Sequence, residues 1–165
     1  FDLFLNSPVD DADLEVTLSE VRADGKEMYV QSGWLRASHR KPGPAATRLW
    51  PAQTLQENAW EPLPLNQWTP VRVGTAGFAH AMRTGSRIRV SIDTPGGVRA
   101  DWRFANKTFP EMVKYGIAHD AAHPSKIVLP RLAGVPVPTS APPCPSLRGQ
   151  PCRDWVQSVN VPFTP

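Results

Sequence analysis

Hydrophobic and polar residues alternate in several short stretches of the chain, a pattern typical of β-strands with one buried face. In residues 14–19, Leu, Val and Leu alternate with Glu, Thr and Ser, and a strand-like run follows at 28–35. The Asp24-Gly25 pair between these two stretches is typical of a tight hairpin turn. The sequence therefore predicts a β-hairpin whose first strand buries one face.

Other parts of the chain favour further strands and very little helix. Residues 1–5 have strand-like composition, and so do residues 68–73, where Pro70 favours a position at the edge of a sheet. Alternation predicts that Ile88, Val90 and Ile92 point inward, whereas Arg87, Arg89 and Ser91 point outward. The remaining expected elements are strands at 98–104 and 126–129 and one short helix at 110–122.

Proline divides the chain into a strand-rich part and a tail. The 165 residues include 19 prolines, which argues against a helical bundle because each proline removes a helix hydrogen bond. Residues 40–67 are expected to form a long proline-rich loop. We predict an all-β jelly-roll sandwich over residues 1–132, followed by a proline-rich C-terminal tail over residues 133–165.

Charge and hydropathy argue against a nucleic-acid partner and against a membrane-spanning segment. The net charge is +3 and the basic residues are dispersed, so we expect no nucleic-acid partner. No run of about 18 apolar residues is present, so no membrane span is expected. No signal-peptide pattern is recognised, and the abrupt start at Phe1 favours a fragment or a processed chain, from which localisation signals are expected to have been removed.

The two cysteines are Cys144 and Cys152, with seven residues between them. A metal site needs more soft ligands nearby, so a disulfide that closes a small loop is the better interpretation, and two free thiols are the alternative. A disulfide implies an oxidising compartment, and hence a secreted or cell-surface protein.

The sequence holds no local catalytic motif. G-x-S-x-G, the P-loop and the dinucleotide fingerprint are all missing, and a triad assembled from distant residues is the remaining route to catalysis. His119 and His123 have the spacing of metal ligands on a helix, but Pro124 follows at once, and we expect neither a metal nor a cofactor. The acidic residues that precede the first long strand favour a turn, with calcium as the alternative: Asp10, Asp11 and Asp13.

Two pairs of residues are the candidates for binding. Trp50 and Trp60 lie in the long loop, where we expect the indole rings to hold the loop against the sandwich. The alternative is that exposed rings stack on sugars or fill a partner's pocket. Arg36 and Arg40 end the second hairpin strand and are candidates for a domain interface.

Four segments, in order, resemble one family. The segment 13–25 resembles D-L-x-V-x-L-x-x-V-x-P-D-G, and 33–40 resembles G-x-L-R-A-x-x-R. Residues 78–80 with 85–92 resemble A-H-x-F-x-x-G-H-R-I-R-V-x-I, although Ser86 stands where the family often has histidine. The fourth segment, 123–130, resembles the family's closing strand. The family is the C-terminal domain of X-Pro dipeptidyl-peptidases and cocaine-esterase-like acyl hydrolases, and the resemblance covers about residues 1–132.

The resemblance implies a galactose-binding-like jelly roll that follows an α/β-hydrolase domain, with the catalytic triad in that other domain. No catalytic residue is therefore assigned to this chain. The domain is expected to pack on the catalytic domain of a serine hydrolase with dipeptidyl-peptidase or esterase activity, to shape substrate access and to join subunits into homo-oligomers. The first jelly-roll strands are expected to be absent, which would leave an unpaired edge. The alternatives are a free-standing carbohydrate-binding module and a self-contained enzyme.

Overall fold

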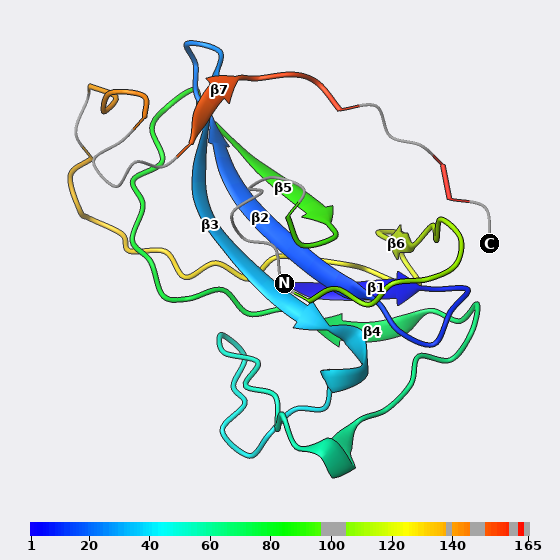
Figure 1. Cartoon of the computed structure of the whole chain (residues 1–165). Coiled ribbons are helices and arrows are strands. Elements are labelled where there is room, and N and C mark those ends of the chain that lie inside the picture. Colours follow the sequence, from blue (N-terminus) through cyan, green and yellow to red (C-terminus); the bar gives the residue numbers. More distant parts are fainter. Residues whose placement is uncertain (97–104, 138–139, 146–150, 159–161, 164–165) are drawn as a thin grey trace.

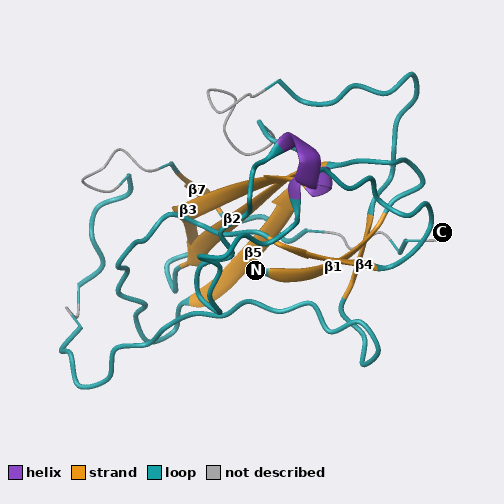
Figure 2. Ribbon diagram, turned by 90° about the horizontal axis from the view of Figure 1, so that it is seen from below, coloured by secondary structure: helices purple, strands orange, loops and turns teal. Residues whose placement is uncertain are grey.

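The computed structural model describes residues 1–96, 105–137, 140–145, 151–158 and 162–163. Within these residues the chain forms two antiparallel sheets that make a β-sandwich (Figures 1 and 2), which confirms the all-β prediction. One sheet has the order β4-β1-β6, and the other has the order β5-β2-β3-β7. The bounds in chain order are β1 Asp2–Asn6, β2 Asp13–Val21, β3 Lys26–Arg36, β4 Thr69–Arg72, β5 Arg87–Asp93, β6 Gly116–Ala118 and β7 Cys152–Asp154.

The core lies between β1 and β4 of one sheet and β2 and β3 of the other. Its buried side chains come from all four strands and from the chain next to them, and they are Leu3, Leu5, Ala12, Leu14, Val16, Leu35, Ala37, Leu63, Val71 and Val73. The predicted hairpin is present as β2 and β3, and the predicted edge strand is present as β4. The expected galactose-binding-like arrangement stays a prediction.

Strand β2 is buried on both faces, so the expectation of a single buried face is wrong. Glu15 and Thr17 belong to the face opposite the core, yet each is only 1% exposed. The Thr17 hydroxyl lies 2.7 Å from the Ser32 hydroxyl across the hairpin. The backbone N–H of Gly96, from the turn after β5, donates to Glu15. Because these hydrogen bonds satisfy the polar groups, the strand keeps an alternating sequence even though both faces are covered.

Strand β5 only partly follows the expected orientation. Ile92 packs against the core, whereas Ile88 and Val90 remain 49% and 38% exposed. Arg89 is turned to the opposite face but is not free, because it pairs with the buried carboxylate of Glu27 at 2.9 Å. Ile88 and Val90 share the face of Ile92 but are not buried in the core as expected, because the core cluster ends near Val16, the cross-strand neighbour of Ile92.

Two expected elements are absent from the described chain. The segment 110–122 is not a helix but contains β6, which pairs with β1 through Gly116 and Ile117. The segment 126–129 forms no strand, because only Lys126 bridges to β1, through two hydrogen bonds with Asp2. The strand expected at 98–104 lies outside the described residues. The described helical turns are two short 3-10 helices, η1 (Ala37–His39) and η2 (Glu57–Ala59).

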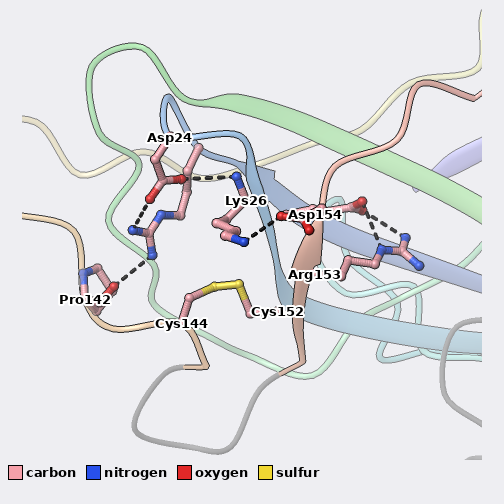
Figure 3. The surroundings of a disulfide bond; sticks show 9 residues. Asp24, Lys26, Pro142, Cys144, Cys152, Arg153 and Asp154 are labelled. Carbon is pink, nitrogen blue, oxygen red and sulfur yellow. Dashed lines mark hydrogen bonds and ion pairs between the residues drawn. A yellow bond between two sulfur atoms is a disulfide. The ribbon is translucent and has the colours of Figure 1, made fainter.

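The tail is attached to the sandwich. Cys144 and Cys152 form the predicted disulfide, with their Cα atoms 5.5 Å apart. Strand β7 begins at Cys152 and extends the second sheet beside β3, where Lys26 pairs with Asp154 and Glu27 pairs with Arg153 (Figure 3). A disulfide is compatible with an extracellular protein. The boundary at residue 132 remains a prediction.

Candidate domain interface

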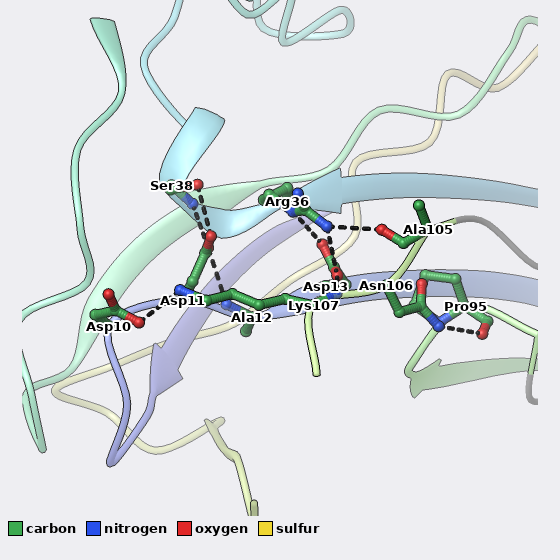
Figure 4. A network of polar contacts seen from close by, with 10 residues as sticks. All are labelled: Asp10, Asp11, Ala12, Asp13, Arg36, Ser38, Pro95, Ala105, Asn106 and Lys107. Atoms are coloured by element: carbon green, nitrogen blue, oxygen red, sulfur yellow. Dashed lines mark hydrogen bonds and ion pairs between the residues drawn. The ribbon is translucent and has the colours of Figure 1, made fainter. Parts of the chain in front are cut away.

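The long loop between β3 and β4 is fixed to the sandwich at several points, the first of which is Asp11. This buried carboxylate accepts hydrogen bonds from the backbone N–H and the hydroxyl of Ser38, both at 2.8 Å, and from the backbone N–H of Ala12 at 2.9 Å (Figure 4). Ser38 belongs to η1, which starts the loop. Asp11 therefore holds the beginning of the loop against the entry to β2.

Asp13 and Arg36 join the two hairpin strands at the same end. The guanidinium binds both carboxylate oxygens, at 2.7 and 2.9 Å, and also donates to the carbonyl of Ala105 (Figure 4). Burial acts to raise the pKa of Asp13, but the hydrogen bonds from Arg36 and from the backbone N–H of Lys107 outweigh it and lower that pKa below its ordinary value. Arg36 thus stabilises the point at which the loop leaves β3.

Arg40 fixes the later part of the loop. Its guanidinium donates to the carbonyls of Glu61 and Pro62 and lies 3.4 Å from the Glu61 carboxylate. The backbone N–H of Glu61 also donates to the carbonyl of Ser38, at 2.9 Å. The structure therefore places both arginine candidates in intramolecular contacts that support the loop. Trp60, directly before Glu61, is 50% exposed.

Residues 41–54 form a small hairpin within the loop. Pro42 bridges to Gln53, and the Gln53 amide donates to the carbonyl of Arg72 in β4 at 2.8 Å. Arg72 in turn donates to the carbonyls of Thr47 and Arg48. These contacts tie the hairpin to the edge strand of the first sheet, and Figure 1 shows the loop projecting beyond β4.

The fixed loop exposes large apolar side chains. Leu49 and Trp50, at the hairpin turn, are 57% and 52% exposed. Leu49 also lines a small hollow of about 40 Å³ together with Leu129, from the segment that follows β6. Leu129 and Leu132 are exposed as well. Two segments far apart in sequence therefore present apolar side chains at one place, which we call the apolar patch: Leu49, Trp50 and Leu129.

The two candidate tryptophans belong to separately anchored parts of the loop. Trp50 lies on the hairpin that Arg72 holds, whereas Trp60 follows η2, where Arg40 holds the chain. Neither indole lines the small hollow beside the patch or the larger groove at the Phe109–Lys114 segment. Neither of these two hollows in the described part of the chain therefore joins the two rings in a shared concave surface of the kind that a sugar-binding site uses.

The acidic residues before β2 have protein partners. Asp10 pairs with the Lys107 ammonium at 2.7 Å, and Asp11 and Asp13 bind the groups described above. No group of three or more side chains suited to a metal ion occurs among the described residues. Pattern alone could not reveal these pairings, because Lys107 comes from a segment 94 residues away from Asp13.

One cluster brings together a serine, a histidine and a carboxylate. Glu20 of β2 is buried and receives a hydrogen bond from Ser86 at 2.6 Å, and its other oxygen lies 2.7 Å from Nε2 of His80. Burial raises the pKa of Glu20, but these hydrogen bonds outweigh it and hold that pKa below its ordinary value. In a nucleophilic triad the imidazole stands between serine and acid. Here the carboxylate stands between them, so the cluster fastens the chain before β5 to β2.

When the chain is compared with known proteins, one family model matches it. The family model of the X-Pro dipeptidyl-peptidase C-terminal non-catalytic domain matches residues 1–127, which is most of the chain. Neither the curated proteins nor the solved structures gave a match. In the described part of the chain no helix has the length and apolar character needed to cross a bilayer.

Proposed function

Because the chain belongs to the family of X-Pro dipeptidyl-peptidase C-terminal non-catalytic domains, we propose that it packs on an α/β-hydrolase catalytic domain through the loop of residues 41–65. We call this segment the docking loop. The observation that carries the proposal is the apolar patch of Leu49, Trp50 and Leu129 at the side of an anchored loop. Exposed apolar surface that gathers at one place marks an interaction site more often than scattered apolar residues do.

The anchoring of the docking loop supports the proposal energetically. A flexible loop loses conformational entropy when it binds, and each immobilised side chain adds about 0.5–1.5 kcal/mol to that loss. The docking loop is already held by Arg40 and Arg72 through backbone carbonyls. Tryptophan and arginine are enriched at interface centres, where a rigid aromatic ring gives a large contact area. In this proposal Arg36 and Arg40 position the loop, and Trp50 touches the catalytic domain.

A role in substrate access follows from the same contact. A loop that projects beyond the sandwich and lies on the catalytic domain can restrict which substrates reach the active site. The hydrolysis itself, of a bond after proline or of a small acyl ester, belongs to the catalytic domain. We also propose that the protein is secreted or displayed at the cell surface, which the disulfide supports. Association of two copies is a further prediction, tested by the oligomeric state in solution.

The test uses the longer chain that joins this domain to its hydrolase domain. We expect Trp50→Ala and Leu49→Ala to lower its melting temperature and to change the ratio of kcat/KM values for a short and a long proline-containing substrate. Ile88→Ala is the matched control, because Ile88 is exposed on β5 and lies outside the apolar patch and outside both hollows. Unchanged stability and unchanged substrate ratios in both patch variants would overturn the proposal.

The carbohydrate-binding alternative predicts a different result. If the loop tryptophans bind sugars, a glycan titration quenches tryptophan fluorescence, and Trp50→Ala or Trp60→Ala removes the quenching. We expect no quenching across the panel. A saturable signal that depends on either tryptophan would replace the docking proposal with a sugar-binding one.

A further inference from the structure

An aromatic ring from the C-terminal tail packs against the first sheet. The ring of Phe163 packs directly on Gly116 of β6, so closely that a Cβ atom at residue 116 would overlap it. Phe163 also meets Trp68 edge to face, with the ring centroids 5.9 Å apart. Trp68 contacts His123 at 5.5 Å, and His123 contacts Phe4 at 5.3 Å. We call the surface formed by Gly116, Trp68, His123 and Phe4 the aromatic seat.

A groove of about 590 Å³ lies on another side of Phe163, which forms part of its wall. The rest of its lining is largely apolar, with Glu111 and Lys114 as the charged members: Pro8, Val9, Asn66, Phe109, Pro110, Glu111, Met112, Val113 and Lys114. This volume is within the range of sites that hold small ligands. Phe163 therefore contacts the aromatic seat and also lines a hollow that has room for more residues of a peptide.

A glycine inside a strand contributes no side-chain packing and often marks the close approach of another group. At residue 116 the close group is an aromatic ring from the chain's own tail. Earlier in the tail, β7 is held by the disulfide, and Arg89 donates to the carbonyl of Val156. Six residues separate Val156 from Phe163, so the tether limits how far the ring can move from the seat.

We propose that the aromatic seat and its groove form a binding site for a peptide that presents a phenylalanine ring next to proline, with Pro162-Phe163 as the intramolecular occupant. A segment tied by a short linker has an effective concentration in the millimolar range. The tail therefore blocks the site against weaker free peptides and yields to a tighter one. The groove shares no lining residue with the docking loop, so this inference stands apart from the contact with a catalytic domain.

The experiment measures binding of a labelled acetyl-Val-Pro-Phe-Thr-Pro-amide peptide, which copies residues 161–165, to the 165-residue chain by fluorescence anisotropy. Phe163→Ala should bind the peptide at least tenfold more tightly than the wild type, because the seat is then empty. Adding Gly116→Ala to this variant should weaken binding at least tenfold, because the new methyl group fills the place of the ring. Adding Gly77→Ala instead is the matched control, since a Cβ there meets nothing within 4 Å.

The double variant should fold, because the three atoms nearest to the added Cβ all belong to the Phe163 ring, which is absent in it. A thermal melt of each variant checks this before binding is compared. Failure of the folded Phe163→Ala protein to bind the peptide would overturn the inference. The inference would also be overturned if the wild type bound the peptide as tightly as Phe163→Ala does, or if adding Gly116→Ala left the affinity of Phe163→Ala unchanged. A third contrary result would be equal affinity for a peptide with alanine in place of phenylalanine.

Discussion

Removal of the Asp11 carboxylate should release η1, which leads into the docking loop, and destabilise the whole domain. In Asp11→Ala the backbone N–H groups of Ala12 and Ser38 lose their acceptor, and the Ser38 hydroxyl loses its partner. A buried N–H without an acceptor costs about 1–3 kcal/mol, and the hydroxyl can turn elsewhere. Two such groups give an expected loss of about 4 kcal/mol in the free energy of unfolding.

The Asp11→Asn variant removes the negative charge of the side chain but keeps its hydrogen bonds, so it separates the two contributions to stability. Both N–H groups bind the same oxygen, Oδ1, which an asparagine keeps. The other oxygen becomes an NH₂ group, which can donate to the Ser38 hydroxyl because a hydroxyl also accepts. What is lost is the strengthening that the charge gives, so we expect a loss of about 1–2 kcal/mol. The two variants should therefore differ by about 2 kcal/mol or more.

The assay is urea unfolding of the 165-residue chain with its disulfide intact, monitored by tryptophan fluorescence. The free energies of unfolding of all variants are calculated with one shared m-value. Hydrogen exchange at the Ser38 amide gives a second readout, which should rise in Asp11→Ala and stay near the wild type in Asp11→Asn. The reasoning is refuted if Asp11→Ala loses less than about 1 kcal/mol, or if Asp11→Asn loses as much as Asp11→Ala.

Three further outcomes are expected. The pKa of Asp13 is lowered in the folded protein, so its ion pair stabilises the fold above the unfolded pKa and is lost as the pH falls through the folded pKa. The difference in melting temperature between the wild type and Asp13→Asn should accordingly shrink from pH 6 to pH 2, and a constant difference would contradict this. Reduction of the Cys144–Cys152 disulfide should lower the free energy of unfolding by about 2.5 kcal/mol, as a loop this short predicts, and denaturant curves with and without reductant measure it. Gly33→Ala should destabilise the domain by more than about 2 kcal/mol, because its Cβ would overlap a backbone carbonyl oxygen, whereas Gly77→Ala should change stability little. Equal melting temperatures for the two glycine variants would refute the packing argument.

The strands that the sequence predicts best are those with clear alternation and a local turn. The β2–β3 hairpin has both, with Asp24-Gly25 at the turn, and its position in the second sheet follows. The helix predicted for the segment 110–122 is wrong because hydrophobic positions there follow neither the helical nor the strand period clearly. The pairing of Gly116 and Ile117 with β1 decides the structure of this segment. Such pairing joins segments more than 100 residues apart, which local pattern cannot show.

The candidate site was predictable only in part. Trp50 and Trp60 are about half exposed, which the sequence left open, because a ring that packs on the sandwich and a ring that faces solvent can stand in the same proline-rich loop. Most partners of Arg36 and Arg40 were not predictable, since they are backbone carbonyls such as those of Ala105, Glu61 and Pro62, and any residue type supplies a carbonyl. The exposure of Ile88 likewise depends on how far the facing sheet extends.

The most direct test of the docking proposal is hydrogen exchange of the docking loop in two settings. The amides around Leu49, Trp50 and Leu129 are measured in the isolated 165-residue chain and in a longer chain that joins it to the proposed hydrolase domain. The account predicts slower exchange at these three places in the longer chain, with unchanged exchange around Met112. Equal exchange at the patch in both settings, or protection around Met112 instead, would contradict it.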